Sequence, residues 1–339
     1  MNPNASYRHD RAGVIAVEAV EAPEVITSDW IDEQLMPTYE RWGLRPGLLA
    51  ELAGIKERRW WPEGVTFDQA AAMAGRKAIE ASGVDPGEIG MMISTSVCKH
   101  HLEPSVACAV HHQLDLGPHC VNFDLGNACL GFINAMDVAA MAIEAGHARY
   151  VLIVDGEGSR IPQQLTIDRL ASPDATVADV FENFATLTLG SGAAAMVLGP
   201  PRPGGHAFTG SVSRAATRHN DLCVGGLEGM RTDTAALLAA GLELASDTIA
   251  AADAEGLEWR GCDMYVMHQV SSVHTNKMCE IIDVDPTTVP LTYPTLGNMG
   301  PAAVPYTLSM VADQLKPGDR ILLCGIGSGL NCSLAELIW

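Results

Sequence analysis

The chain is poor in positive charge and in aromatic residues. Its 339 residues include 21 Lys and Arg against 41 Asp and Glu, which gives a formal net charge of −20. A chain this acidic lacks the basic surface that nucleic-acid binding requires, so no nucleic-acid partner is expected. Aromatic residues make up only 5% of the chain while 47% of it is hydrophobic, so a large core has to be filled mainly by aliphatic side chains.

The sequence also has no CxxC pair among its nine cysteines, which stand at positions 98, 108, 120, 129, 223, 262, 279, 324 and 332. With a polar stretch at 1–11 and no apolar signal segment there, this odd count predicts reduced thiols and a cytoplasmic protein. An uncharged run at 289–312 contains four prolines, so no membrane span is predicted there. The histidine pairs at 100–101 and 111–112 lack a further Cys or His at ligand spacing, so we predict no metal site and favour a solvated helix face.

Hydrophobic periodicity alternates between strand and helix along the chain, which predicts an α/β protein. In the first half we expect strands at 13–20, 88–95, 120–123, 149–154 and 193–198, and helices at 28–39, 67–82, 103–114 and 130–146. Ser28 is the expected cap of the first of these helices, and residues 54–61 and 156–188 are expected to be irregular. A proline- and glycine-rich hinge follows at 200–205. In the second half we expect helices at 233–254, 272–282 and 302–315, and strands at 263–267, 320–324 and 331–338.

The two halves of the chain repeat the same order of elements. A shift of 298 − 127 = 171 residues places Asn127 on Asn298, and the same shift places Gly90 on Gly261. One offset near half the chain length predicts a duplicated α/β unit whose halves pack in layers, with polar residues of both meeting at the centre. The predicted halves are 1–199 and 200–339.

Cys129 lies in the stretch Asn-Ala-Cys-Leu-Gly-Phe, between a predicted strand and a predicted helix. A cysteine at such a corner lies near free N–H groups and the positive end of the helix dipole, which favour the reactive thiolate. Gly131 would let a substrate approach the backbone closely. Free cysteines are also often buried in cores, so this stretch alone is equally consistent with a structural cysteine.

The second half supplies two further polar residues at predicted element ends. His268 follows a strand, where open α/β sheets place their ligands, and Asn298 stands in a glycine-bracketed turn before a helix. Taken singly, a histidine there is more often a satisfied structural residue, and an asparagine is more often a helix cap. The loop 325–329, Gly-Ile-Gly-Ser-Gly, offers backbone N–H groups to an oxyanion. It fits neither a dinucleotide fingerprint, because a strand follows it, nor a serine-hydrolase elbow, because the G-x-S-x-G spacing is absent.

Together these motifs resemble the thiolase superfamily, and within it the ketoacyl synthase III branch. The resemblance covers nearly the whole chain and rests on Cys129 in its stretch, His268 in His-Gln-Val-Ser, Asn298 in Gly-Asn-Met-Gly-Pro-Ala-Ala, and the closing Gly-Ile-Gly-Ser-Gly-Leu. It implies a thiolase fold of duplicated αβα halves in a five-layer αβαβα architecture. The runs 96–105 and 58–61 resemble, more narrowly, the OleA-type enzymes. Those enzymes join two fatty acyl-CoA molecules head to head without decarboxylation, in long-chain olefin and β-lactone pathways.

The resemblance implies a role for each motif. Cys129 is similar to the nucleophile of that family, and His268 and Asn298 to its oxyanion-binding pair. Ser328 falls where the family uses a backbone N–H beside that of Cys129. Glu103 matches the glutamate proposed as the base, which the family inserts from the neighbouring subunit of a homodimer.

The implied reaction is a Claisen condensation of two fatty acyl-CoA thioesters to a 2-alkyl-3-ketoacyl-CoA, with coenzyme A as part of the substrate and no separate cofactor. Arg58, Arg59 and Trp60 are candidates for substrate binding, or else for packing at a subunit interface. A homodimer is expected, or a heterodimer with a related chain. One alternative is a decarboxylating ketoacyl synthase III that uses malonyl-ACP, for which Glu103 would be a helix-terminal charge. The other is a non-catalytic partner subunit, a class that usually lacks the nucleophile.

Overall fold

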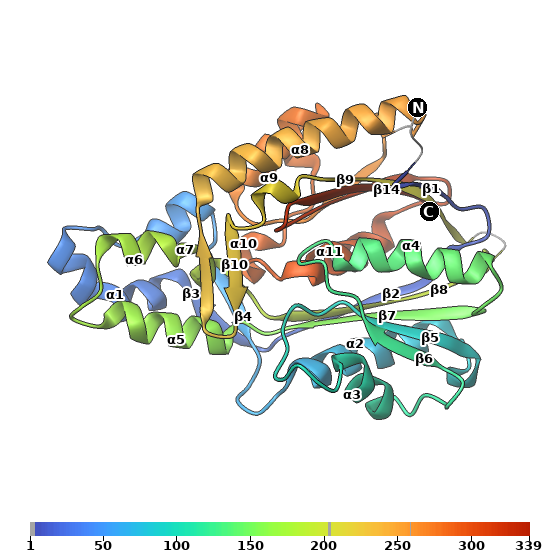
Figure 1. Ribbon diagram of the computed structural model, residues 1–339, viewed down its shortest axis with the longest axis horizontal. Coiled ribbons are helices and arrows are strands. Elements are labelled where there is room, and N and C mark those ends of the chain that lie inside the picture. The colour runs from blue at the N-terminus through green and yellow to red at the C-terminus, as the bar shows by residue number, and fades with distance from the viewer. Residues whose placement is uncertain (1–3, 203–204, 258) are drawn as a thin grey trace.

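The computed structural model describes residues 4–202, 205–257 and 259–339. Its elements form five layers, shown in Figure 1. Helices α4 and α11 lie between two parts of a mixed sheet, α2 and α3 cover the outer face of one part, and α8 and α9 cover the outer face of the other. This is the αβαβα architecture of duplicated halves that the sequence predicts. The helices are α2 Phe67–Ser82, α3 Val106–Gln113, α4 Gly131–Glu144, α8 Thr234–Ala254, α9 Ser272–Ile282 and α11 Ala303–Val311.

Within the described residues the strands run in the order β12-β13-β14-β9-β2-β8-β7-β5-β6, with β1 beside β9. The two parts of the sheet meet where β2 and β9 pair over two residues at one end. Strands β5, β6 and β7 are parallel, as are β12 and β13 in the other part, so equivalent strand ends occur in both halves. The strands are β1 Ser6–Arg8, β2 Gly13–Glu21, β5 Ile89–Ser94, β6 Val121–Asp124, β7 Tyr150–Glu157, β8 Gly192–Gly199, β9 His206–Ala215, β12 Met264–Met267, β13 Arg320–Gly327 and β14 Asn331–Ile338.

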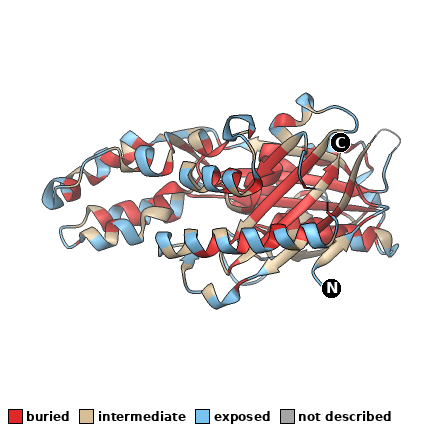
Figure 2. Cartoon of the chain, turned by 90° about the horizontal axis from the view of Figure 1, so that it is seen from above, coloured by how far each residue is buried: buried red, intermediate tan, exposed pale blue. Residues whose placement is uncertain are grey.

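The central layer holds α4 in a fixed place. Phe132, Ile133 and Met136 of α4 belong to one buried cluster with Leu308 of α11 and with residues from both parts of the sheet. Burying a side chain of this size contributes roughly 2 kcal/mol. Figure 2 shows much of the sheet buried, and every residue of β7 and β8 is buried. The start of α4, where Cys129 lies, is therefore positioned by the core of the protein.

Local signals set the ends of α2 as the sequence predicts. Thr66 and Gln69 form a reciprocal capping box at its start, and Gly83 ends it with a φ of 63°, in the left-handed region that glycine favours. On β7, a Cβ at Gly156 would lie 2.2 Å from the carbonyl oxygen of Phe67. Only glycine allows this close approach of α2 to the sheet.

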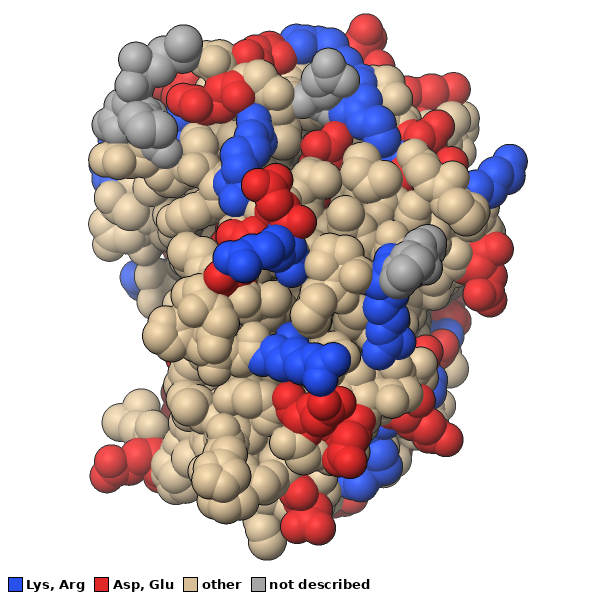
Figure 3. All heavy atoms as spheres, turned by 90° about the vertical axis from the view of Figure 1, so that its right-hand side faces the viewer, with Lys and Arg blue, Asp and Glu red and all other residues tan. Residues whose placement is uncertain are grey.

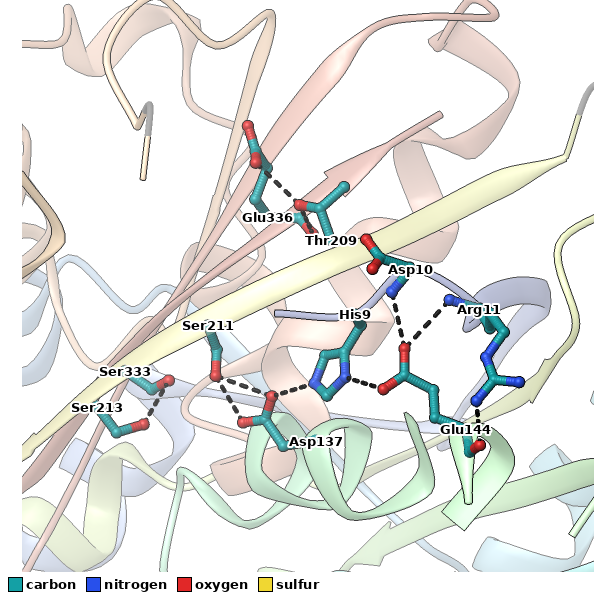
Figure 4. Close-up of polar contacts among 10 residues, drawn as sticks. All are labelled: His9, Asp10, Arg11, Asp137, Glu144, Thr209, Ser211, Ser213, Ser333 and Glu336. Carbon is teal, nitrogen blue, oxygen red and sulfur yellow. Dashed lines mark hydrogen bonds and ion pairs between the residues drawn. The ribbon is translucent and has the colours of Figure 1, made fainter. Parts of the chain in front are cut away.

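The segment after β1 ties the N-terminal region to α4, as Figure 4 shows. The ring of His9 lies 3.3 Å from Asp137 and 3.5 Å from Glu144, both on α4. Glu144 also accepts the backbone N–H groups of Asp10 and Arg11 at 2.7 and 3.1 Å. Burial lowers the pKa of His9, but hydrogen bonds and charge from Asp137 and Glu144 outweigh it and raise the pKa above 6.5.

Residues 156–188 are not irregular, which corrects the prediction for this segment. They contain α5 Arg160–Ala171, α6 Val177–Glu182 and α7 Phe184–Thr188, which pack with α1 Ser28–Trp42 into a lobe at the left of Figure 1. Their apolar residues are widely spaced because each short helix contributes only one or two of them to a shared small core. That core includes Leu35, Leu170, Val180 and Leu187.

Two further expectations about local structure were wrong. The N-cap of α1 is Thr27, whose hydroxyl accepts the N–H of Trp30, and not Ser28. Within the expected loop 54–61, strand β4 Glu57–Trp60 pairs with β3 Glu24–Thr27. The hairpin of β10 Cys223–Gly226 and β11 Gly229–Thr232 was also not expected.

The division into 1–199 and 200–339 stays a prediction. The described chain passes from β8 to β9 at this point, but Pro203 and Gly204 of the predicted hinge lie outside the described residues. β1 also crosses the division, because it comes from the first half and pairs with β9 of the second.

The exterior has two features that bear on partners. Helix α8 is long and apolar enough to cross a membrane by length and composition, with a hydropathy of 1.4. Its buried side chains, such as Leu244 and Ile249, belong to the hydrophobic cluster that covers β14 and β9. Helix α8 therefore packs against the sheet as an outer-layer helix of the fold. Figure 3 shows Lys and Arg interspersed with Asp and Glu over the face it displays.

Candidate active site

Cys129 lies at the predicted corner between β6 and α4. The chain turns through Ala128, which has a positive φ of 45°, and the N–H groups of Leu130 and Gly131 close the turn onto Asn127 and Ala128. A non-glycine residue at positive φ is uncommon and marks a backbone held by its surroundings. Helix α4 begins at Gly131, two residues after the cysteine.

The loop 325–329 packs directly on this corner. A Cβ at Gly327 would lie 3.3 Å from the backbone nitrogen of Cys129. Asn331 donates from its side chain to Asn127 at 3.1 Å, and Asn127 donates to Asn134 of α4 at 2.6 Å. The closing glycine-rich loop and the cysteine corner therefore form one unit, although Gly327 and Cys129 are 327 − 129 = 198 positions apart in the sequence.

The environment of Cys129 does not favour a thiolate, which corrects the expectation from the helix terminus. Burial raises the pKa of the thiol to about 12, with additional effects from Cys223, Glu157 and Asp155. Hydrogen bonding to the backbone opposes this shift but is outweighed. At neutral pH Cys129 is therefore a neutral thiol, and its deprotonation would need a proton acceptor.

His268 is buried at the end of β12. Burial lowers its pKa to about 3, the neighbouring His274 adds to this effect, and the backbone of Gly300 opposes it. Its Nδ1 has no hydrogen-bond partner among the described residues. At neutral pH the ring is uncharged, so it can donate one hydrogen bond and accept another.

Asn298 is held by the backbone on both sides. Its N–H donates to Thr188 at 2.9 Å, and its carbonyl accepts from Gly190 at 2.8 Å. The side-chain Oδ1 accepts the N–H of Gly300 at 3.0 Å, so the residue does cap the following turn, as its sequence context suggests. This contact fixes the orientation of the amide and leaves its NH2 group to donate elsewhere.

Gln269 connects the His268 and Asn298 segments and was missed by the sequence analysis. Its side chain donates to Pro290 at 2.7 Å and accepts from Thr292 at 2.8 Å. Because Gln269 follows His268 directly, the end of β12 and the turn that leads to Asn298 are joined by one buried side chain.

Glu157 is the second residue that the sequence analysis missed. It ends β7 with its side chain buried, and a Cβ at Gly300 would lie 3.7 Å from its carboxyl carbon. Burial raises its pKa to about 7, partly offset by hydrogen bonds from Cys98 and Val97. The charge of Glu157 also raises the pKa of Cys129. The sequence signal is the pair Asp155 and Glu157 in an otherwise apolar strand.

Glu103 stands apart from this centre within the chain. It is exposed in the loop between β5 and α3, beside Leu102, which is 99% exposed. Helix α3 begins at Val106 with Ser105 as its N-cap, which corrects the predicted start at residue 103. Glu103 therefore lies outside the helix, and a charge that only stabilises the helix dipole does not account for it.

The assignment of Arg58, Arg59 and Trp60 to substrate binding stays a prediction, and the structure shows contacts of all three within the chain. Arg58 is fully buried and donates to backbone oxygens of Ile26 and Leu187, and burial lowers its pKa to about 10. Trp60 is buried, with its ring N–H donated to a glutamine side chain. Arg59 is paired with two carboxylates at 2.6 and 2.8 Å. Most of their donors are bonded inside the chain, and the Nε of Arg58 has no hydrogen-bond partner among the described residues.

A cavity of about 490 Å³ lies beside the end of β7. Its lining is mainly apolar and includes Trp61, Phe67, Ile161 and Leu165, with Gly158 on the side next to Glu157. Among the described residues, no group of three His, Cys, Asp or Glu side chains is placed to hold a metal ion.

Comparison with known proteins agrees with this geometry. Residues 123–161 match the family model for 3-oxoacyl-acyl-carrier-protein (ACP) synthase III, and residues 252–339 match the model for its C-terminal part. The chain is 44% identical to an acyl-CoA:acyl-CoA alkyltransferase of Xanthomonas campestris, covering 94% of this chain and 96% of the relative. A second alkyltransferase, from Shewanella oneidensis, is 35% identical over the same shares of the two chains.

Solved structures of Xanthomonas campestris OleA superpose closely on this chain. A cysteine-to-serine variant with bound lauric acid and lauroyl-CoA has a TM-score of 0.95 at 42% identity, covering 98% of this chain and 100% of that one. Variants of the same enzyme at a glutamate and at a histidine superpose equally well. This chain therefore belongs to the OleA-type acyl-CoA:acyl-CoA alkyltransferases, a family of condensing enzymes with the ketoacyl synthase III fold.

Proposed function

We propose that this protein joins two fatty acyl-CoA thioesters in a non-decarboxylative Claisen condensation, releasing one coenzyme A and a 2-alkyl-3-ketoacyl-CoA. The observation that carries the proposal is the packing of Gly327 against the backbone nitrogen of Cys129. This packing supports a role for Cys129 as the nucleophile, with the glycine-rich loop beside the oxyanion of an acyl-cysteine. The names and bound ligand of the relatives supply the substrate class.

The first half-reaction is the acylation of Cys129. The thiol loses its proton and attacks one thioester, and the N–H groups of Cys129 and Ser328 stabilise the tetrahedral oxyanion. Removing one such donor typically costs about 3 kcal/mol of transition-state stabilisation. Collapse of this intermediate expels coenzyme A and leaves the acyl group on sulfur.

The second half-reaction needs a carbanion. The thioester oxygen of the second acyl-CoA lies near His268 and Asn298, whose donors stabilise the enolate that forms when Glu103 removes the α-proton. The carbanion then attacks the acyl-cysteine, forms the new carbon–carbon bond and returns the thiolate of Cys129. The neutral state of His268 suits this role, because an uncharged ring keeps one N–H to donate.

Glu103 acts in the active site of the partner subunit of a homodimer in this proposal. This assignment is supported by the exposure of the loop tip at Leu102 and Glu103, which leaves the Glu103 carboxylate on the surface of its own subunit. The apolar cavity beside Gly158 provides room for part of an alkyl chain. The structure records no disulfide among the described cysteines, which is consistent with a reducing cytoplasm. The product class fits long-chain olefin or β-lactone biosynthesis.

The test is incubation of the purified protein with lauroyl-CoA as the sole substrate. We expect a product whose mass equals two acyl-CoA molecules minus one coenzyme A, and no need for a malonyl donor. A product formed only when malonyl-ACP is added would support the decarboxylating alternative. Absence of any product, with an acylated Cys129, would support a non-catalytic or incomplete subunit.

Donation in trans is tested with a mixed dimer of Cys129→Ala and Glu103→Ala. One of its two sites then has both groups and the other has neither, so condensation should return although neither homodimer is active. Donation within one subunit would leave both sites of the mixed dimer broken.

A further inference from the structure

Glu157 holds the beginning of the loop that carries Glu103. Its Oε1 accepts the N–H of Val97 at 2.6 Å, and the N–H of Cys98 also donates to the carboxylate. The Cys98 thiol donates to the carbonyl oxygen of Gly158 at 3.5 Å. The end of β7 therefore fixes the first two residues of the segment 97–104, here called the base loop.

The middle of the base loop is fixed and its tip is not. Lys99 pairs with Asp124 at 2.8 Å, and the ring of His100 stacks on Phe67 with ring centroids 4.3 Å apart. Beyond them the loop turns outward, where Leu102 is 99% exposed. The position of the tip, where Glu103 lies, is therefore set by these contacts together with the anchor at Val97 and Cys98.

The other side of Glu157 faces its own active site. Its carboxyl carbon lies 3.7 Å from the position of a Cβ on Gly300, whose N–H is bound by Asn298. The ionisable groups that interact with Glu157 are Asp155 on β7, Cys98 in the base loop and Cys129 at the nucleophile corner. The buried carboxylate of Glu157 thus lies near the Gly300 turn of its own active site and also holds the base loop, which is proposed to complete the active site of the partner subunit.

We propose that Glu157 is a positioning residue for condensation in the partner subunit's active site, where it sets the place of Glu103 by anchoring the base loop at Val97 and Cys98. This inference rests on the proposed function, in which Glu103 is the base in trans. Glu157 itself touches neither the α-proton nor the thioester. Its removal should impair the α-deprotonation step and spare acylation of Cys129 in its own subunit.

The first test separates the two half-reactions in Glu157→Gln. An amide keeps the size of the side chain but can accept through only one of its two end atoms, so part of the anchor is lost. We expect condensation to fall by about tenfold to a hundredfold, the usual effect of losing a charge-assisted hydrogen bond. Acylation by lauroyl-CoA, followed by intact-protein mass spectrometry, should be at least as fast as in the wild type, because a negative charge near Cys129 has been removed. A loss of acylation equal to the loss of condensation would overturn the proposal.

The matched control is Glu144→Gln. Glu144 also accepts two successive backbone N–H groups, those of Asp10 and Arg11, but it holds the N-terminal segment and not the base loop. Both half-reactions should be unchanged in this variant. An equal fall of condensation in both variants would mean that any lost carboxylate anchor has this effect, and would overturn a specific role for Glu157.

Reciprocal mixed dimers test the direction of the effect. In a dimer of Glu157→Gln with Cys129→Ala, the surviving nucleophile receives Glu103 from the subunit with an intact Glu157. We expect it to match a dimer of wild type with Cys129→Ala. In a dimer of wild type with the double variant Cys129→Ala/Glu157→Gln, the surviving nucleophile receives Glu103 from the altered loop, and condensation should fall as in the Glu157→Gln homodimer.

If condensation instead fell only in the dimer of Glu157→Gln with Cys129→Ala, Glu157 would act in its own subunit's active site. Equal activity in the two mixed dimers would show that Glu157 has no effect specific to either subunit's site. Either result overturns the inference. Recovery of activity in the mixed dimer of Cys129→Ala with Glu103→Ala would then show that the proposed function still stands. Failure of that dimer to recover would instead locate the error in the trans assignment of Glu103.

Discussion

Alkylation of Cys129 by iodoacetamide should be slow at neutral pH and should keep accelerating far into the alkaline range. The pKa of the thiol is raised from 9.0 to about 12, chiefly by burial. The difference, 12 − 9 = 3, lowers the thiolate fraction at neutral pH by about a thousandfold relative to an ordinary cysteine. Because the thiolate is the reacting form, the alkylation rate should fall with it.

The assay is a pH series of alkylation followed by peptide mass spectrometry. Exposed Cys108 serves as an internal reference in the same sample, and Cys129→Ala identifies the peptide signal. Poor access of iodoacetamide to Cys129 would slow its alkylation at every pH. The slope of the logarithm of the alkylation rate against pH is therefore the decisive quantity. We expect the Cys129 rate to rise by about tenfold per pH unit up to roughly pH 10 without levelling off.

The same series in Glu157→Gln gives a second check. Glu157 is one of the groups that raise the pKa of Cys129, so the Cys129 curve should move to lower pH in this variant. A rate that levels off near pH 7 in the wild type would refute the reasoning, because it would show a thiolate already stabilised at the start of α4. Rapid acylation by lauroyl-CoA is still expected, since the bound substrate gains the oxyanion donors that iodoacetamide does not use.

Three further predictions follow from the site and the fold. Cys129→Ala should show no acyl adduct with lauroyl-CoA by intact-protein mass spectrometry, and a persisting adduct would place the nucleophile elsewhere. His268→Ala and Asn298→Ala should still be acylated but lose condensation, since they are proposed to hold the second carbonyl, and failure at acylation would contradict that division. His9→Gln should lower the free energy of unfolding by about 1–2 kcal/mol near pH 6, measured by urea denaturation. Because the pKa of His9 is raised in the folded state, its contribution to stability is complete below about pH 6.5 and is lost as the pH rises through the folded-state pKa. An equal loss of stability in the variant near pH 9 would contradict a role for the charge beside Asp137.

Local sequence determined the elements that frame the site. The capping box at Thr66 and the glycine at position 83 set both ends of α2, since these signals act over a few neighbouring residues. The corner at Cys129 and the turn at Asn298 were likewise readable, because a strand, a small polar turn and an apolar helix follow one another in each half. The shift of 171 residues predicted that the two halves would place these turns in equivalent positions.

Only the tertiary structure decided the chemistry around those residues. Arg58 looks like a surface cation in the sequence, yet it is fully buried among backbone oxygens. The thiol of Cys129 is neutral because burial acts more strongly on its charge than the nearby helix terminus does. Glu157 falls in the segment 156–188 that was expected to be irregular, and its importance comes from the base loop and the Gly300 turn that approach it from elsewhere in the chain. Burial and long-range contacts depend on where distant segments meet, and the local pattern of side chains does not contain that information.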